Sequence, residues 1–404
     1  MIPLIMETNR AVYGSYAAEL ERLGVTGSLR ALPQAESLGR WISRDGRRML
    51  NLSSNDYLGL ASEQSLAEEF ADSLHSTSSG GGWLPLSSSS SRLLTGNHEA
   101  YGALEERLAA MYGRESALVL SSGYHMNSGV LPALCDRKTL ILADKLVHAS
   151  LIDGIRLCEG RCVRFRHQDY AQVESILEKE AGAYERIFIV TESIFSMDGD
   201  LAPLQRLVEI KRRWPSVMLY VDEAHAVGVR GANGLGLAEE CGCIGDIDLL
   251  CGTFGKALAS VGAYVVCDRV IKEYLVNKMR TLIFTTALPP VNVAWSLFIM
   301  ERLQLFGGRR EHLDRISSEV RKAFALRGMQ MPSGSHIIPM IIGSSADAVL
   351  RAEDMQRHGF YVLPIRPPTV PEGTSRLRFS LTASLKEEDI AKLIEYETGF
   401  SETS

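Results

Sequence analysis

The chain has 404 residues, of which 46% are hydrophobic and 23% are charged, so it can bury a large core plus a smaller domain. Its formal net charge of −6 argues against nucleic acid or an anionic membrane surface as a partner. Residues 1–10 lack the basic and long apolar segments of a signal peptide, and no later run is apolar for long enough to cross a membrane. We therefore expect a cytoplasmic protein.

The middle of the chain alternates short apolar runs with amphipathic stretches. Several runs are apolar at nearly every position, as strands covered on both faces are. This alternation predicts an α/β fold with a mostly parallel sheet and helices on both sides. The runs expected as strands are 117–120, 139–142, 187–190, 217–221, 247–251 and 263–266, and the stretches expected as helices are 99–111, 147–157, 169–180 and 201–214.

The pattern changes after about residue 290 to a long helical stretch, 291–305, and then to mixed helix and strand, which indicates a second domain. A Ser/Gly-rich segment, 76–91, comes before the expected sheet. A linker is the ordinary interpretation of such a composition, and an ordered loop near a ligand is the other. The expected parts are an N-terminal arm over 1–50, a large domain over 51–290 and a small C-terminal domain over 291–404.

Polar clusters follow four of the expected strands directly. Ligands bind at the carboxyl ends of the strands in an open parallel sheet, so these clusters should converge. The first cluster contains Ser122, Gly123 and Tyr124 and opens a helical pattern. Free N–H groups at a helix start, with glycine allowing close approach, suit a phosphate. A Ser-Gly turn after a strand is common, so this signal is weak alone.

The second cluster ends at His148, which by itself is more simply a surface or core histidine. The third is Asp222-Glu223-Ala224-His225, directly after a strand. A carboxylate and a histidine so placed can both address one flat heterocycle, and the carboxylate would keep a ring nitrogen protonated. Metal ligation is the rival interpretation. The run lacks the H-E-x-x-H spacing and no other ligand cluster supports it, so we expect no metal site.

The fourth cluster is Thr253-Phe254-Gly255-Lys256. A lysine on a short loop of small residues at a strand end would be partly desolvated, which lowers its pKa and lets it form an imine with an aldehyde. Thr253 could hydrogen-bond a phosphate near that lysine. The four clusters together require an aldehyde, a protonatable ring nitrogen and a phosphate. Pyridoxal 5'-phosphate has all three.

At these residues the chain resembles the α-oxoamine synthases, pyridoxal-phosphate enzymes that condense an amino acid with an acyl thioester and release carbon dioxide. The resemblance implies an aminotransferase-like (fold type I) large domain, a smaller α+β C-terminal domain and a homodimer. The matching stretches are LNLSSNDYLGLA (50–61), SRLLTGNHEAYGALEERLA (91–109), SSGYHMNSG (121–129), ADKLVHASLIDG (143–154), TESIFSMDGDLAPL (191–204), YVDEAHAVGVRGANGLG (220–236), GTFGKALASVG (252–262), FTTALPP (284–290) and IRPPTVPEGTSRLRFSLTA (365–383).

Within the family, residues 365–378 are most similar to the branch that condenses L-alanine with a pimeloyl thioester in biotin biosynthesis, the acyl group being carried by CoA or by an acyl carrier protein. Three alternatives stay open. One is a sibling enzyme that joins glycine to acetyl-CoA, another is an aminotransferase of the same fold, and the third is a catalytically silent partner subunit. Retention of Lys256, Asp222, His225 and His148 argues against the last.

The resemblance also implies a role for each matching residue. Lys256 would carry the cofactor and exchange the α-proton, while Asp222 would pair with the pyridine nitrogen and His225 with the phenolic oxygen. His148 would stack on the ring, and Ser196 would lie near the cofactor's oxygen. The phosphate end would be lined by Ser122, Gly123, Tyr124 and Thr253, with Thr285 from the other subunit. Arg378 would hold the amino-acid carboxylate, with Asn55 and Glu192 beside it, and Arg30 would face the acyl carboxylate.

Two departures from the family pattern bear on the site. Where relatives often read T-A-x-H, this chain has Thr382-Ala383-Ser384-Leu385, so no histidine role is assigned there. The segment 91–98 carries serine and Leu94 where many relatives have glycine, which leaves the shape of the acyl tunnel open.

Overall fold

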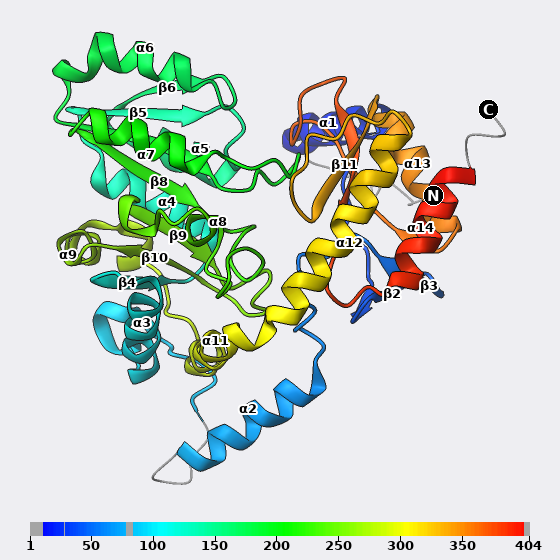
Figure 1. Cartoon of the computed structure of the whole chain (residues 1–404), viewed down its shortest axis with the longest axis horizontal. Coiled ribbons are helices and arrows are strands. Elements are labelled where there is room, and N and C mark those ends of the chain that lie inside the picture. The colour runs from blue at the N-terminus through cyan, green and yellow to red at the C-terminus, as the bar shows by residue number, and fades with distance from the viewer. Residues whose placement is uncertain (1–10, 28, 78–83, 400–404) are drawn as a thin grey trace.

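The computed structural model describes residues 11–27, 29–77 and 84–399. Figure 1 shows two lobes, one built on a large sheet and one on two small sheets, with helix α12 (Gly307–Leu326) running from one to the other. The glycine run 80–82 lies outside the described residues.

The large sheet has seven strands in the order β4-β10-β9-β8-β7-β5-β6. Strand β10 is antiparallel to both of its neighbours and the other pairs are parallel, so the expected mostly parallel sheet is confirmed. The bounds are β4 Ser116–Leu120, β5 Thr139–Asp144, β6 Arg161–Phe165, β7 Arg186–Glu192, β8 Val217–Asp222, β9 Leu249–Thr253 and β10 Ala263–Cys267.

All six expected strands form, and the apolar runs are buried at nearly every position because the sheet is covered by helices. Strand β6 was not expected from the sequence. It lies at the edge of the sheet, where Arg161 and Arg164 are exposed, so it has no continuous apolar run.

The expected helices also form, each within a few residues of its predicted bounds. Helix α7 illustrates the cause: Leu204, Leu207 and Val208 are buried on one face, and basic residues occupy the last turn, where they complement the helix dipole. The helices around the large sheet are α3 Glu99–Tyr112, α4 Gly123–Leu134, α5 Ala149–Arg156, α6 Tyr170–Glu180, α7 Leu204–Arg213, α8 Leu237–Glu240, α9 Arg269–Lys278, α10 Arg280–Ile283 and α11 Pro290–Arg302, with the π-helical turn η2 Arg92–Gly96.

The second lobe combines the two ends of the chain. Strands β11 (Ile337–Gly343), β14 (Ser375–Ser380) and β13 (Pro364–Ile365) form one sheet, and β1 (Glu36–Leu38), β2 (Trp41–Arg44), β3 (Arg47–Asn51) and β12 (Phe360–Tyr361) form the other. Because β3 pairs with β12, part of the N-terminal region lies with the C-terminal region. The three-part division expected from the sequence stays a prediction. Helices α13 (Ser345–Arg357) and α14 (Glu387–Gly399) complete this lobe.

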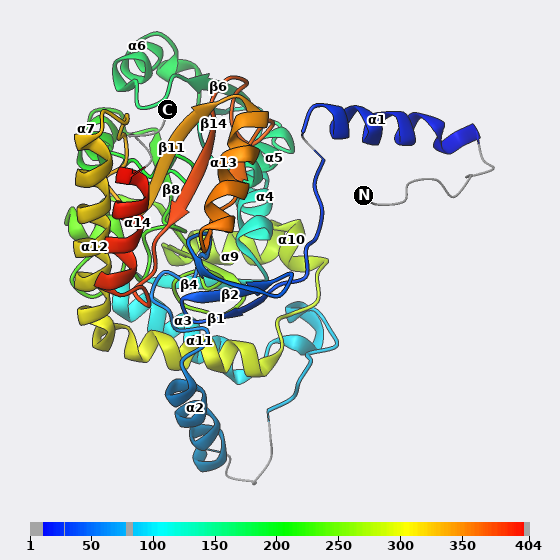
Figure 2. The ribbon, with the colours of Figure 1, turned by 90° about the vertical axis from the view of Figure 1, so that its right-hand side faces the viewer.

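Two helices project from the body of the molecule. Helix α1 (Gly14–Val25) has no buried residue and projects at the upper right of Figure 2, and α2 (Gln64–Thr77) projects at its bottom. None of the helices in the described ranges is long and apolar enough to cross a membrane.

Four neighbouring parallel strands each end in a polar residue. Asp144 ends β5, Glu192 ends β7, Asp222 ends β8 and Thr253 ends β9. These strands are adjacent in the order β9-β8-β7-β5, so their carboxyl ends line one edge of the sheet. Three of the four expected polar clusters follow β5, β8 and β9. The first follows β4, whose carboxyl end lies at the same edge because β10 is antiparallel to both β4 and β9.

Candidate active site

The N-terminus of α4 forms one end of the site. Ser122 caps the helix, its hydroxyl accepting a hydrogen bond from the backbone N–H of His125 at 3.1 Å. A side chain added at Gly123 would meet nothing closer than Thr253 at 3.9 Å, so this helix start is open beside the end of β9. The Thr253 hydroxyl donates to the carbonyl of Gly262 at 3.0 Å. Helix N–H groups next to a hydroxyl are suited to an anionic group.

Tyr124, expected at the same end, directs its hydroxyl elsewhere: it donates to Asp153 of α5 at 2.6 Å. Half of the Tyr124 side chain is nevertheless exposed beside the helix start. Thr285 lies in the segment that borders this end, because the carbonyl of the next residue, Thr286, accepts a hydrogen bond from Ser121 at 3.4 Å.

A hydrogen-bonded chain connects Asp222 with His148. The side-chain amide of Asn127 donates to Asp222 Oδ2 at 2.8 Å and to the hydroxyl of Ser150 at 2.9 Å. Ser150 in turn contacts His148 Nδ1 at 2.8 Å. The second Asp222 oxygen accepts the backbone N–H of Ala224 at 2.9 Å. The carboxylate is therefore buried but held in one orientation, as a partner for a ring nitrogen must be.

Lys256 lies close to two aromatic side chains of the site. Its Nζ is 3.1 Å from His225 Nε2, and His225 Nδ1 is 2.7 Å from the hydroxyl of Tyr57. Burial lowers the pKa of Lys256, while the carboxylates of Asp222 and Glu192 oppose the shift. Burial also holds the pKa of His225 well below its usual range, and the nearby Lys256 amine acts in the same direction. His225 is therefore neutral and can exchange hydrogen bonds with both neighbours.

His148 is exposed within this region, yet the protein atoms around its ring desolvate it enough to lower its pKa; the Asp222 carboxylate opposes this shift and Lys256 adds to it. The ring is anchored as the N-cap of α5, where Nδ1 accepts the backbone N–H of Ser150 at 3.2 Å. A neutral, fixed and exposed ring is suited to stacking on a planar ligand.

Arg378 on β14 reaches the site from the second lobe. Its guanidinium donates to the carbonyl of Ser196 at 2.6 Å, to Asn55 Oδ1 at 3.3 Å and to the Tyr57 hydroxyl at 3.3 Å. The structure thus brings Arg378 together with Asn55, both expected on the amino-acid side, and with Ser196, which was expected near the cofactor's oxygen. A guanidinium beside an exposed amide is a recognition element for a carboxylate.

Glu192 is buried, and the backbone N–H groups of His148 and Ser196 act to lower the pKa of its carboxyl group. Oε1 has no hydrogen-bond partner among the described residues. Burial, together with the Asp222 carboxylate, raises the pKa of Glu192 to about 8, against the opposing effect of Lys256. Glu192 can therefore change its protonation state near neutral pH.

The side chains of the Asp222–His225 run diverge, which removes the basis for the metal interpretation. Glu223 turns away from its neighbours and accepts hydrogen bonds from Ser193 Oγ at 2.6 Å and from the backbone N–H groups of Leu237 and Ala238. Across the described residues, no group of three or more His, Cys, Asp or Glu side chains is arranged to hold a metal ion.

Arg30 is not part of this cluster. It is exposed, and its guanidinium lies 3.5 Å from the hydroxyl of Thr369, in the loop that also carries Arg366.

Leu385, at the position where relatives often have histidine, is buried, and its carbonyl is 2.7 Å from Nε2 of His312. In the Ser-rich segment, the carbonyl of Ser90 accepts the N–H of Ala287, so its described part is ordered beside the site.

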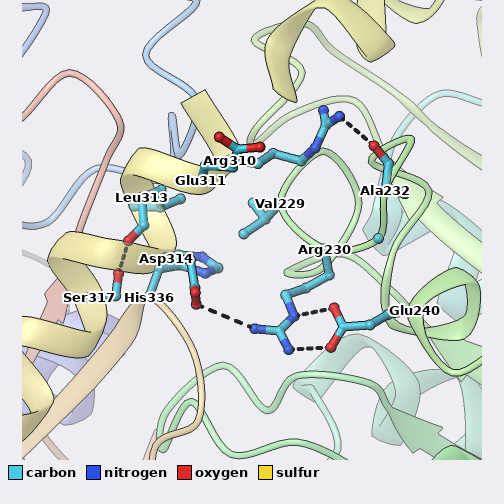
Figure 3. A pocket seen from close by; sticks show the side chains of 11 residues that line it. Val229, Arg230, Ala232, Glu240, Arg310, Glu311, Leu313, Asp314, Ser317 and His336 are labelled. Atoms are coloured by element: carbon cyan, nitrogen blue, oxygen red, sulfur yellow. Dashed lines mark hydrogen bonds and ion pairs between the residues drawn. The ribbon is translucent and has the colours of Figure 1, made fainter. Parts of the chain in front are cut away.

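Three residues of the site had no role in the sequence interpretation: Tyr57, Asn127 and His336. The first two lie within matching stretches, so the motif itself was the available signal. His336 is buried, and its ring lies edge-on to Tyr57 with 4.0 Å between centroids. It also lines a cavity of about 370 Å³ behind the site, between α12 and the loop of Arg230, shown in Figure 3.

The residues present fit pyridoxal phosphate. The fit rests on a partly buried amine at Lys256, a buried and oriented carboxylate at Asp222, and an open helix start beside Thr253. These three features correspond to the aldehyde, the ring nitrogen and the phosphate.

Known proteins share this architecture. Residues 47–396 match the family described as aminotransferase class I and II. The chain is 53% identical over 380 residues, 94% of its length and 99% of the relative, to a Haemophilus influenzae protein that carries the name 8-amino-7-oxononanoate synthase. A serine palmitoyltransferase solved with pyridoxal phosphate is 27% identical and has a TM-score of 0.84. The match covers 95% of this chain and 96% of that protein. The 8-amino-7-oxononanoate synthase of Francisella tularensis is 26% identical, with a TM-score of 0.71 and 87% and 98% coverage.

Proposed function

This chain belongs to the α-oxoamine synthases, within the class I and II aminotransferase family, and we propose that it condenses L-alanine with a pimeloyl thioester to give 8-amino-7-oxononanoate, the free thiol and carbon dioxide. It is a pyridoxal-phosphate enzyme and an acyltransferase. The observation that carries the reaction type is Lys256, an amine of lowered pKa held 3.1 Å from neutral His225 at the carboxyl edge of the sheet. The identity of the substrates rests on the named relative.

Bound pyridoxal phosphate supplies an electron sink for the charge left at the α-carbon of the amino acid. Lys256 holds the cofactor and moves the α-proton, and burial lowers its pKa, which favours the neutral amine that both tasks need. Asp222 keeps the ring nitrogen protonated, because Asn127 and Ala224 fix its two oxygens. His225 hydrogen-bonds the phenolic oxygen, and His148 covers the ring.

The phosphate is held by the start of α4, through Ser122, Gly123 and Tyr124, and by Thr253. The hydroxyl of Thr253, which donates to the Gly262 carbonyl in this structure, can rotate and donate to the phosphate instead. No charged side chain is required there, because helix N–H groups and the helix dipole already favour an anion.

Arg378 binds the carboxylate of L-alanine, with Asn55 on the same side and Ser196 and Glu192 completing the wall. The exposed Asn55 amide can donate to that carboxylate while Arg378 supplies the charge. A carboxylate so held orients the α-carbon toward Lys256.

Arg30 faces the distal carboxylate of the pimeloyl group. The support is its position beside Thr369 and Arg366, which places two guanidinium groups near one exposed loop. Two cations in one place favour an anion, and Arg366 already has its pKa lowered by burial and by Arg30.

The active unit is a homodimer in which Thr285 of one subunit reaches the phosphate end of the other. Two neighbouring segments at that end expose large apolar side chains, with Phe284 at 72% and Leu94 at 79% exposure. Adjacent segments with apolar side chains turned to solvent favour association with another copy.

The test is thiol release by the purified, pyridoxal-phosphate-loaded protein, comparing L-alanine plus pimeloyl-CoA with glycine plus acetyl-CoA. We expect a clear preference for the first pair and none above background for Lys256→Ala, which should also lose the borohydride-reducible cofactor link. Preference for the second pair would assign the chain to a sibling reaction. Transfer of the amino group without thiol release would refute the acyltransferase proposal.

A further inference from the structure

The ring of His167 bridges two carboxylates behind the active site. Nδ1 lies 2.9 Å from Asp144 Oδ1, and Nε2 lies 2.8 Å from Asp200 Oδ2. A neutral imidazole has a single N–H and can donate to only one carboxylate, whereas an imidazolium donates to both. Both contacts are therefore satisfied only when the ring is protonated.

The surroundings of His167 keep that proton in place. Burial alone would lower the pKa of His167, but the hydrogen bonds that its ring donates to Asp144 and Asp200 outweigh burial and raise the pKa to about 10. Another titratable neighbour, Tyr170, has its pKa raised by burial and by the same two carboxylates, so it stays neutral. The ring edge also packs on Phe195, with 4.5 Å between centroids.

Asp144 connects His167 to the His148 side of the site. It is fully buried at the end of β5, and its carboxylate also accepts the backbone N–H groups of Leu146 at 2.8 Å and Gln168 at 2.8 Å. The turn that these bonds fix runs directly into His148. The position of Asp144 therefore sets where His148 begins α5.

Asp200 connects His167 to the other wall of the site, the loop 193–201 that follows β7. Its carbonyl accepts the N–H of Phe195 at 3.1 Å, which closes the loop around Ser196. Its carboxylate also accepts from the Gln168 side chain at 2.6 Å. The two walls are thus joined by the hydrogen bonds that the adjacent residues His167 and Gln168 make to Asp144 on one side and to Asp200 on the other.

A buried charged pair seldom adds net stability, because the cost of removing the charges from water cancels most of the attraction. The best-attested role of a buried charged pair is to favour one conformation of the chain over the alternatives. Asp144 and Asp200 without the imidazolium would be two carboxylates close together in the interior, and they would repel each other. The 144–148 turn and the 193–201 loop would then move apart where both contact His167.

We propose that His167 is a positioning residue, whose protonated ring holds the 144–148 turn and the 193–201 loop in register so that His148 and Ser196 face the same bound substrate. It touches neither the cofactor nor the substrate and acts through Asp144 and Asp200. The inference deepens the proposed function and rests on it for the identity of the ligand.

The test uses His167→Asn as holoenzyme, with two measurements that involve no turnover. The first is the visible circular dichroism of the bound cofactor, which depends on how His148 covers it. The second is the dissociation constant of L-alanine, from the absorbance change without an acyl donor. We expect a smaller dichroic band and L-alanine binding weaker by about tenfold or more, since a misplacement of 1 Å can have larger effects.

The matched control is His358→Asn, because His358 also faces a carboxylate, Asp354, but lies in the second lobe. It should leave both measurements unchanged. A lowered melting temperature of His167→Asn with wild-type dichroism and wild-type L-alanine binding would overturn the proposal. If His167→Asn does not fold, Asp200→Asn decides: it keeps the contact to Asp144 and should show a smaller change of the same kind, and wild-type values would equally overturn the proposal.

The wild-type protein separates this inference from the proposed function. A wild-type chain without a visible cofactor band that responds to L-alanine would refute the proposed function. A wild-type chain that responds normally, beside a His167→Asn variant that behaves identically, would refute only the role of His167.

Discussion

At the scale of single residues, Asn127 shows how one buried side chain sets the chemistry of others. Its amide nitrogen serves Asp222 and Ser150, and its oxygen accepts the hydroxyl of Tyr220 at 2.6 Å. The orientation of the ring-nitrogen partner and, through Ser150, of His148 therefore depends on a residue that contacts neither the cofactor nor the substrate in the proposed arrangement.

We expect Asn127→Ala to lower the free energy of unfolding by about 1–3 kcal/mol, because Asp222 and Tyr220 each lose a buried partner. The same change should reduce kcat/KM on the order of tenfold or more through misorientation of Asp222. Urea unfolding and steady-state kinetics measure the two effects. The exposed Asn277, which bonds only the carbonyl of Glu273, gives the control Asn277→Ala. Equal effects of both variants would contradict the role of Asn127.

Glu192 gives a pH-dependent prediction at the same scale. Its folded-state pKa, raised by burial to about 8, exceeds the ordinary glutamate value, so the folded protein binds more protons than the unfolded chain between these values. The contribution of Glu192 to stability is therefore full at low pH and is lost as the pH rises toward about 8.

Glu192→Gln removes this titration, so in the cofactor-free protein the variant should gain stability relative to wild type as the pH is raised from about 5 to about 8. Urea midpoints across this range provide the measurement. The control is Glu209→Gln, at an exposed position, whose urea midpoints should follow those of wild type across this range. Parallel curves for Glu192→Gln as well would show that its carboxyl does not titrate in this range.

At the scale of elements, the site depends on how the loop after β7 docks on β11. Gly199 has φ +70°, and a Cβ there would lie 1.9 Å from the carbonyl of Ile337. The carbonyl of Gly199 accepts the N–H of Gly334 at 3.1 Å, and Asp198 forms an ion pair with Arg376 on β14. The loop that carries Ser196 is therefore held to the strands of the lobe that carries Arg378.

We expect Gly199→Ala to destabilise the protein by about 1–3 kcal/mol through backbone strain and steric overlap, and to raise KM for L-alanine because Ser196 and Arg378 separate. Thermal unfolding and L-alanine kinetics test both parts. Gly245→Ala is the control, since a Cβ at Gly245 meets no atom within 4 Å. A destabilised Gly199→Ala with unchanged KM would show that the docking matters for stability alone.

At the scale of the whole molecule, apolar side chains gather on segments that adjoin the phosphate end. Turn η2 packs next to the segment 284–288, because a Cβ on Gly96 would lie 2.9 Å from Ala287. Gly262 approaches the same segment at Leu288. Phe284, Leu94 and Val261 are at least half exposed around this region. A surface of this kind next to the site is consistent with the proposed homodimer.

The wild-type protein should therefore sediment at twice the 44.5 kDa chain mass. Phe284→Asp should shift it toward the monomer and weaken cofactor binding, because a charge in an apolar interface is left desolvated and unpaired. Analytical ultracentrifugation and cofactor titration check these outcomes. Leu350→Asp, on exposed α13, should change neither. A monomeric wild type with full cofactor affinity would contradict the dimer proposal.

Local sequence patterns were enough to predict every strand of the large sheet except β6, together with the four polar clusters at the carboxyl ends of strands. Both follow from local patterns: a strand buried on two faces is continuously apolar, and a polar residue that ends such a run marks the sheet edge. The same reasoning could not find β6, because an edge strand is half solvated and loses that pattern.

Which distant residues meet at that edge depends on how the chain folds as a whole. Arg378 contacts Asn55 across 323 positions of the chain, and Tyr57 reaches His225 across 168. His167 bridges Asp144 and Asp200 across two connections of the sheet. Such contacts depend on strand order and on the docking of the two lobes, whereas sequence periodicity reports only whether a residue's own element is buried. Motif resemblance supplied the roles of several of these residues, but their mutual support became visible only in the folded chain.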